Sequence, residues 1–442
     1  MSELQQQALP NTTVPAAWKA AADAAAVVDR WLATFGDAAL SALVDEALRH
    51  NADLQSAAAR VEQAGGRLKV ASAPLLPAVS LAGLWSGKAA SGGGGGLNGI
   101  FLNASLELDV WGRLRYGEAV AQAQAASVEA DYAYARQSLA AMIAKSWFVA
   151  IETGLQRALV REMLTAAEDL QRLEQDRLRI GNGNEQAVTE ARAAAGSYRD
   201  ALRQVEQSRD QALRALELLL GRYPAAEIAV ADRLAVLPPP VPSGLPSQLL
   251  ERRPDVVAAE RRVAAAFNRV GEAKAAQLPR ISLTAGGSSI SSDVLVLKDR
   301  NNPAWSLGGN LIAPLYQGGA LRAQVEIRNA EQKQAVADYA SAGQRAFGEA
   351  EGALAAEAAL RDRAVLLDTV VRDNERSLEL ARIQYRVGTI DRRTVEQRQL
   401  ALYSSRTTRL RVQSEQLAQR VNLHLALGGG FDEAPLLPVA AR

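Results

Sequence analysis

Apolar and polar residues alternate along one short stretch of this chain. In FLNASLELDVW (101–111), every second residue from Leu102 to Val110 is apolar and the residues between them are polar. A period of two is typical of a strand with one apolar and one polar face. With the run AVSLAGLWSG (78–87) and the glycines of SGGGGGLNG in between, this stretch predicts a β-hairpin over about 78–111.

A second and weaker pair of strand-like runs follows later in the chain. RISLTAGGS (280–288) and PAWSLGGNLIAPL (303–315) predict a hairpin over about 280–316, with Trp305 and Leu307 on one face. Strands of about 9–11 residues with one outward apolar face suit a membrane barrel, although a small soluble sheet fits the same pattern. Four strands cannot close a barrel alone, so the membrane interpretation requires an oligomer.

The rest of the chain carries helical periodicity, with apolar residues three or four positions apart in stretches such as ALRQVEQSRDQALRALELLL (201–220). Gly112 to Gly181 and Gly319 to Gly388 both span 69 residues. A continuous helix of that length runs about 100 Å. Each long helix is therefore expected to turn at its glycine and to pack beside shorter helices.

These elements occur twice, because the chain contains two copies of one plan. NADLQSAAARVEQAGGRLKVASAPLLPAVSL (51–81) matches RPDVVAAERRVAAAFNRVGEAKAAQLPRISL (253–283) at a spacing of 202 residues, which becomes 207 from Leu114 onward. The sequence predicts a mainly α-helical fold of two tandem repeats. The expected segments are an N-terminal extension (1–40), repeat 1 with its tip near 181 (41–222), a Pro-rich connection (223–247), repeat 2 with its tip near 388 (248–427) and a C-terminal segment (428–442).

Composition excludes several classes of function. The net charge is +1 with charged residues at 22%, which gives no electrostatic reason to expect nucleic acid. The chain has no cysteine, so thiol catalysis and thiolate metal sites are ruled out. His50 and His424 stand alone, and no phosphate-binding loop or nucleophile motif appears. The sequence predicts neither an enzyme nor a cofactor site.

The membrane has to be reached by strands if it is reached at all. Residues 1–40 carry no basic segment followed by an apolar one, so we expect the signal peptide and any lipidated cysteine to be absent from this chain. No run of 18 apolar residues is present, so no spanning helix is expected.

Several motifs together resemble the TolC-like outer-membrane efflux factors, in the OprM/NodT branch. The resemblance covers nearly the whole chain, and its strongest pieces are LLERRPDVVAAERRV (249–263), AAQLPRISLTAGG (275–287), LELDVWGRLR (106–115), PLYQGGALRAQV (314–325) and LALGGGF (425–431). It implies a homotrimer in which each chain gives four strands to a twelve-stranded β-barrel in the outer membrane of a Gram-negative bacterium. The helices then form a long periplasmic barrel.

The resemblance also implies function and partners. The protein is expected to be the passive exit duct of a tripartite efflux system, or of a system like type I secretion. Its partners would be a periplasmic adaptor, an inner-membrane pump of the RND or a similar type, and outer-membrane lipid.

The two glycine breaks resemble the family's periplasmic tips, which meet the adaptor. The expected docking residues are Arg179, Gly181, Asn182, Arg386, Gly388 and Thr389. The glycines permit the positive φ of a tight reversal, and the polar residues after them can cap the next helix. Turn chemistry alone also accounts for these residues.

A periplasmic gate is expected near the second tip, where the resemblance places a tyrosine. Tyr385 precedes Gly388, but Gln397 stands where the family commonly has a carboxylate, and Glu396 lies next to it. We hypothesise that Tyr385, Arg386, Glu396 and Gln397 form this gate, whereas a solvated charge run is the simpler interpretation. Glu107 and Asp109 are expected to line the barrel lumen, unless they serve only the solubility of that face.

A soluble coiled-coil scaffold or a periplasmic adaptor is the alternative. It explains the helices and the repeat, but it leaves the two alternating hairpins unexplained.

Overall fold

The computed structural model describes residues 8–9, 14–15, 17–20, 29–85, 97–242, 244, 246–292 and 303–430. Half of the segment expected at 1–40 and most of the segment expected at 428–442 therefore lie outside the described residues. The chain forms two compact units. Unit 1 comprises Met1–Pro10, Ala58–Asp131 and Asp255–Ala342, and unit 2 comprises Asn11–Ala57, Tyr132–Pro254 and Gly343–Arg442.

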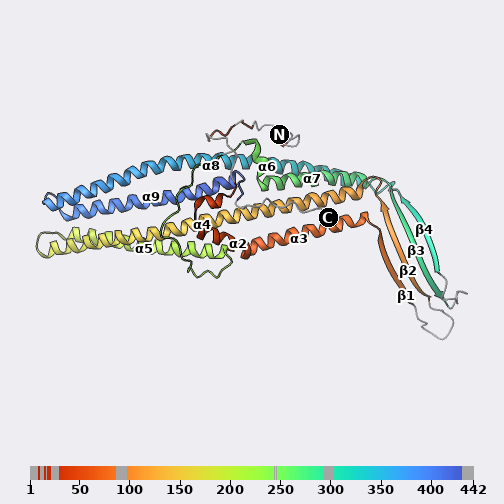
Figure 1. Ribbon diagram of the computed structural model, residues 1–442, viewed down its shortest axis with the longest axis horizontal. Coiled ribbons are helices and arrows are strands. Elements are labelled where there is room, and N and C mark those ends of the chain that lie inside the picture. The colour runs from red at the N-terminus through yellow and green to blue at the C-terminus, as the bar shows by residue number, and fades with distance from the viewer. Residues whose placement is uncertain are drawn as a thin grey trace. The chain divides into compact units, whose positions relative to one another are not determined.

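Long helices dominate both units (Figure 1). The α-helices are α2 (Ala38–His50), α3 (Ala52–Ser72), α4 (Arg113–Arg179), α5 (Glu185–Leu219), α6 (Leu249–Arg252), α7 (Pro254–Ala275), α8 (Ala320–Val387) and α9 (Arg392–Ala426). Short 3-10 helices are η1 (Trp31–Phe35), η2 (Ala73–Leu75) and η3 (Pro246–Gln248). The two long helices, α4 with 67 residues and α8 with 68, end just before Gly181 and Gly388, as the glycine spacing predicted.

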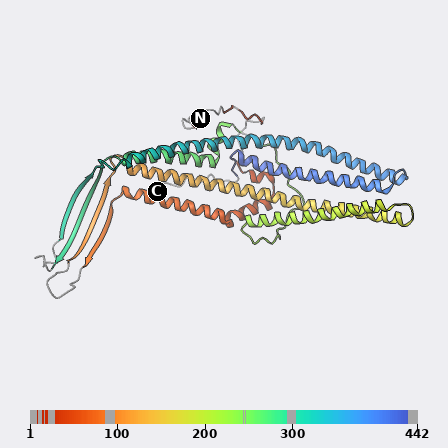
Figure 2. The same cartoon turned by 180° about the vertical axis from the view of Figure 1, so that it is seen from behind.

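In unit 1, parts of α3, α4, α7 and α8 lie side by side and continue into four strands (Figures 1 and 2). The strands are β1 (Ala78–Trp85), β2 (Leu97–Leu108), β3 (Arg280–Ser292) and β4 (Pro303–Ile312). They form one antiparallel sheet in the order β1-β2-β3-β4, so each repeat contributes a hairpin and β2 joins the two hairpins through β3.

The strand register sorts side chains onto two faces, because residues that pair across strands share a face. One face is largely apolar and includes Val79, Leu81, Leu102, Ala104, Leu283, Ala285, Trp305 and Leu307. The opposite face is largely polar and includes Ser80, Asn103, Ser105, Glu107, Ser282, Thr284, Ser306 and Asn310. The two-faced sheet expected from the alternating sequence is therefore present. Its apolar residues are exposed, with Leu81 at 73% and Leu307 at 86%.

Unit 2 holds the main hydrophobic core, where α2, α4 and α5 meet. Trp147 and Phe148 of α4 are fully buried there with Leu216 of α5 and Leu40 of α2. The Trp147 indole N–H donates to Asp37 Oδ2 at 2.8 Å, and the other oxygen of Asp37 accepts the Leu40 N–H at the start of α2. One carboxylate thus caps a helix and satisfies a buried indole, which fixes α2 against α4.

By length and composition alone, one described helix, α4, is apolar enough to cross a membrane, although it contains no uninterrupted run of 18 apolar residues. An 18-residue window of this helix reaches a mean hydropathy of 1.2, because its alanines and aliphatic residues carry few charges between them. Most of that window, 56%, is buried inside the protein, as in the core helix of a helical bundle.

Candidate functional site

The two tips share one backbone geometry. At the first tip, the Gly181 N–H donates to Leu178 O at 3.0 Å and the Asn182 N–H to Arg177 O at 2.8 Å. At the second, the Gly388 N–H donates to Tyr385 O and the Thr389 N–H to Gln384 O, both at 3.0 Å. This pair of bonds is the Schellman ending of a helix, and it requires the positive φ of 77° at Gly181 and 81° at Gly388.

The helices that leave the tips begin with capping side chains. Asn184 Oδ1 accepts the Ala187 N–H at 2.8 Å, and Asp391 Oδ1 accepts the Thr394 N–H at 3.0 Å. Thr389 differs from its expected role as a cap of the following helix, because its hydroxyl donates back to Gln384 O at the end of α8. A threonine placed directly after the αL glycine reaches the open carbonyls of the helix that has just ended more easily than the next N–H groups.

Exposed aliphatic residues lie at the tips beside the two glycines. Ile180 is 67% exposed and Val387 is 73% exposed, and they are equivalent positions of the two repeats. Arg179 and Arg386 precede them and are also exposed. Each tip therefore presents one apolar side chain next to one guanidinium.

Two ion pairs join the tips to each other, and no sequence pattern indicates them. Arg177 Nη1 lies 3.5 Å from Asp391 Oδ2, and Arg393 Nη2 lies 3.8 Å from Glu190 Oε2. Each hairpin thus contributes one arginine and one carboxylate to the two ion pairs. Hydrogen bonds from the Thr394 backbone and hydroxyl hold the pKa of Asp391 below its ordinary value, and Arg177 lowers it further.

The four expected gate residues lie near the second tip, but they do not form one cluster of contacts. Glu396 is buried, and its ion pair is with Arg392 at 3.4 Å, one turn earlier in α9. Tyr385, at 46%, Arg386 and Gln397 are all exposed. Within the described residues of this single chain, Glu396 is therefore held by its own helix.

The two carboxylates expected in the lumen lie at the junction of β2 and α4. Glu107 is on the polar face of the sheet, where Arg113 Nη2 donates to both of its oxygens at 2.9 and 2.8 Å. Asp109 follows β2 and accepts the Leu114 and Arg115 N–H groups, both at 2.9 Å. Burial raises the pKa of Asp109, but these N–H donors and the Arg115 guanidinium lower it below its ordinary value. Both charges are thus matched by arginines at the start of α4.

One histidine and one tryptophan make contacts that no sequence pattern indicates. His424 is 3% exposed and stacks on Trp31, with ring centroids 5.7 Å apart. A helix-surface position was equally compatible with its sequence, because no local pattern shows which face of α9 meets η1. Trp111 donates its indole N–H to Pro279 O at 2.8 Å, which ties the end of one hairpin to the start of the next.

Long helical hairpins with capped tips, together with a sheet that exposes an apolar face, define a channel-type membrane protein built from helices and strands. Known proteins give the same result. The family model described as outer membrane efflux protein matches residues 43–222 and 245–429. The chain therefore belongs to the outer membrane efflux protein family.

Relatives and solved structures cover almost the whole chain. The cation efflux system protein CusC of Escherichia coli (strain K12) is 31% identical over 409 residues, which is 90% of this chain and 88% of that protein. The pyoverdine export outer membrane protein OpmQ of Pseudomonas aeruginosa is 30% identical over 94% of this chain and 91% of its own length. The solved VceC from Vibrio cholerae superposes with a TM-score of 0.83 at 26% identity, covering 92% of this chain and 100% of that one.

The chain is accordingly an outer-membrane efflux channel. Proteins of this family are channels of tripartite pumps in Gram-negative bacteria, they extend from the outer membrane into the periplasm, and they work with adaptor and inner-membrane pump partners. A soluble scaffold is not favoured by any of these findings.

Proposed function

We propose that the chain acts as a homotrimeric exit duct, which receives substrates from a periplasmic adaptor and an inner-membrane pump of the RND or a similar type. The observation that carries this proposal is the four-stranded sheet. Its edge strands β1 and β4 each have one neighbour within the sheet, and all of β1 is exposed. Unpaired edges call for further strands, and three copies supply the twelve that close a barrel.

The two faces of the sheet support the orientation of that barrel. The apolar face would meet lipid, and the polar face with Glu107 would line the lumen. Asp109 would sit at the lumen's inner end, where its bond to the start of α4 joins strand to helix. Because arginines match both charges, we propose that these carboxylates order the junction more than they select cations.

The tips are proposed to dock the adaptor. Arg179, Gly181 and Asn182 form the first docking loop, and Arg386, Gly388 and Thr389 form the second. Exposed Ile180 and Val387 support this proposal, because an apolar residue beside an arginine suits a contact surface better than a solvated turn.

The gate is proposed to close between copies of the chain rather than within one. Tyr385, Arg386 and Gln397 are accessible on the second hairpin, whereas Glu396 is already held by Arg392. The accessible residues would then contact the next subunit, and Glu396 would fix the helix that presents them.

The cargo is proposed to be chosen by the pump. The relatives are named for cation efflux, pyoverdine export and toluene efflux, although their identity to this chain is nearly the same, 30–31%. One duct architecture that accompanies such different cargoes supports a passive channel.

The first test is the mass of the purified chain in detergent and after detergent removal. A trimer that requires detergent, with conductance in a planar bilayer, is the expected result. A monomer that stays soluble without detergent would refute the barrel.

Docking and gating need separate measurements. Because the chain has no native cysteine, Val387→Cys gives a single reactive site, which should crosslink to the adaptor, unlike a control such as Lys69→Cys on α3. For the gate, Arg386→Gln with Tyr385→Phe should raise conductance. Unchanged conductance would count against these residues.

A further inference from the structure

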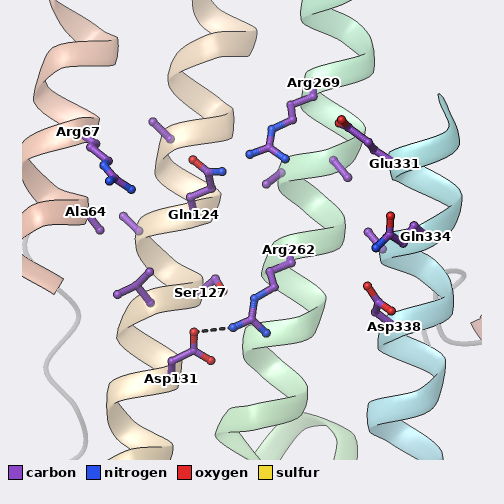
Figure 3. A pocket seen from close by; sticks show the side chains of 16 residues that line it. Ala64, Arg67, Gln124, Ser127, Asp131, Arg262, Arg269, Glu331, Gln334 and Asp338 are labelled. Carbon is purple, nitrogen blue, oxygen red and sulfur yellow. Dashed lines mark hydrogen bonds and ion pairs between the residues drawn. The ribbon is translucent and has the colours of Figure 1, made fainter. Parts of the chain in front are cut away.

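A cavity of about 440 Å³, open to solvent where Arg67 and Gln124 are exposed, lies among α3, α4, α7 and α8 of unit 1 (Figure 3). Six of its sixteen lining residues are alanines: Ala64, Ala121, Ala125, Ala265, Ala266 and Ala335. Alanine side chains let the helices pack closely but do not fill the space between them, and longer polar side chains extend into that space. None of its lining residues belongs to the tips, the gate or the sheet.

Both repeats contribute the same positions to this cavity. Arg67 of α3 is equivalent to Arg269 of α7 at the spacing of 202 residues, and Asp131 of α4 is equivalent to Asp338 of α8 at 207. The repeat therefore brings two arginines to one cavity from separate helices, 202 residues apart in sequence.

Not all of the charged side chains here are available to a ligand. Arg262 pairs with Asp131 across α7 and α4. Glu331 accepts two bonds from Arg328 Nη1, at 3.0 and 2.7 Å. Each of these two pairs has no net charge, so the net charge of the cavity is determined by the remaining ionised groups.

The remaining groups are Arg67, Arg269 and Asp338. In the described part of the chain, neither Arg67 nor Arg269 has a hydrogen-bond or ion-pair partner. Their guanidinium groups point toward each other, with the Gln124 amide between them (Figure 3). Two cations that face each other across a cavity repel, and an anion between them removes that repulsion.

We propose that this cavity binds a small oxyanion, the carboxylate or phosphate group of a small molecule, between Arg67 and Arg269. The planar fork of a guanidinium matches two oxygens of either group, and two forks hold one anion from opposite sides. The Gln124 amide supplies a third donor. Asp338, on α8, opposes the anion and limits its affinity. The site is thus an anion site within the helical part of the channel.

Calorimetric titration of the full chain in detergent tests the site, with inorganic phosphate and citrate as probes at low ionic strength. One saturable site per chain is expected for at least one probe. Arg67→Gln and Arg269→Gln should each weaken binding about tenfold or more, as expected when a charge-assisted bond is lost. The double variant should abolish binding, and Asp338→Asn should tighten it about two- to threefold.

Arg261→Gln is the matched control, because it removes the same charge from α7 at an exposed residue outside the cavity. It should change binding by less than about twofold. A wild-type chain that shows no saturable binding of either probe would overturn the proposal. Equal losses of probe affinity in Arg261→Gln and Arg269→Gln would also overturn it. So would displacement of the bound probe by sodium chloride as effective as by the other probe at matched ionic strength, because both results indicate unspecific electrostatic attraction. These measurements do not depend on channel conductance, so failure of the anion site and failure of the duct proposal are distinguishable.

Discussion

The two repeats build the same joint with different side chains. At the end of α5, Gly221 lies against the backbone of His50, and at the end of α9, Gly428 lies against the backbone of Arg252. A Cβ on Gly221 would stand 2.6 Å from His50 O, so both joints require glycine at a positive φ. Backbone contact is therefore common to the two joints.

The side chain that follows satisfies the same carbonyl in each joint by different chemistry. Asn51 Nδ2 donates to Leu219 O at 3.0 Å in the first repeat. In the second, Arg253 Nη1 donates to the equivalent Ala426 O at 3.3 Å and lies 2.7 Å from Glu349. Arg253 is only 1% exposed. The repeated fold thus determines which backbone carbonyl needs a donor, but the donor can be a neutral amide or a charged guanidinium.

Replacing the buried arginine should produce the largest effect. Arg253→Met is expected to lower the free energy of unfolding by about 3 kcal/mol, because it removes a buried charged hydrogen bond and leaves a carbonyl unpaired. Asn51→Ala should cost about 1 kcal/mol, the size of a neutral bond and a helix cap. Guanidinium titration of both variants measures the difference, and equal losses would show that charge adds nothing to the joint.

Arg261→Met provides the control for the first variant. It makes the same substitution in α7 at an exposed residue and should change the free energy of unfolding by less than about 0.5 kcal/mol.

A second difference concerns Glu217 and its equivalent, His424. Glu217 is buried and accepts the N–H groups of Ala226 and Glu227 at 2.6 and 2.8 Å. His424 is buried against Trp31, and burial, together with the nearby charge of Arg420, lowers its pKa to about 3. The folded protein thus keeps His424 neutral, whereas the unfolded chain protonates it below an ordinary pKa of 6.5.

Stability should therefore fall as the pH drops below 6.5. The unfolded state binds the extra proton, so His424 alone should lower the free energy of unfolding by about 2 kcal/mol between pH 7 and pH 5. His424→Phe keeps an aromatic ring against Trp31 and should remove that part of the pH dependence. Guanidinium titrations at both pH values test this. An unchanged difference between them would assign the effect to other groups.

Local sequence rules were sufficient for much of the fold. The period of two in 101–111 predicted the two faces of the sheet, and Gly181 and Gly388 predicted the ends of the long helices. Both features are predictable because strand alternation and positive φ are determined within a few residues. The repeat spacing predicted both hairpins from one plan.

The site was less predictable, since its contacts depend on packing between distant segments. Nothing near Arg393 in the sequence indicates that it lies beside Glu190. The gate hypothesis included Glu396, but in the structure this residue is buried and pairs with Arg392 of its own helix. Glycine and period patterns determine where a helix turns, whereas the rotation of each helix decides which charges meet.

The tip loops offer a smaller contrast. At the first tip, a Cβ on Gly183 would stand 2.8 Å from Leu178 N, so the loop closes tightly on the helix. At the second tip the equivalent residue is Ile390, which packs against the cluster that includes Leu378 and Val395. Gly183→Ala should cost about 1–2 kcal/mol through overpacking. Ile390→Ala should cost about as much through lost burial.

Thermal unfolding of the two variants, with crosslinking to the adaptor, would separate stability from docking. A Gly183→Ala protein as stable as the parent would show that the loop relaxes freely. Gly181→Ala is the matched comparison, because a Cβ there meets open space and only the φ of 77° is strained.

The ion pairs between the tips should have the smallest effect on stability. Arg177 with Asp391, and Arg393 with Glu190, are more than one-third exposed on every side chain. A double-mutant cycle with Arg393→Gln and Glu190→Gln should give a coupling of about 0.2–1 kcal/mol, which falls as salt screens the charges. A coupling of zero at low salt would mean that the two hairpins behave independently. A measurable coupling would mean that the two tips are energetically linked, although each tip is closed by its own glycine and its own cap.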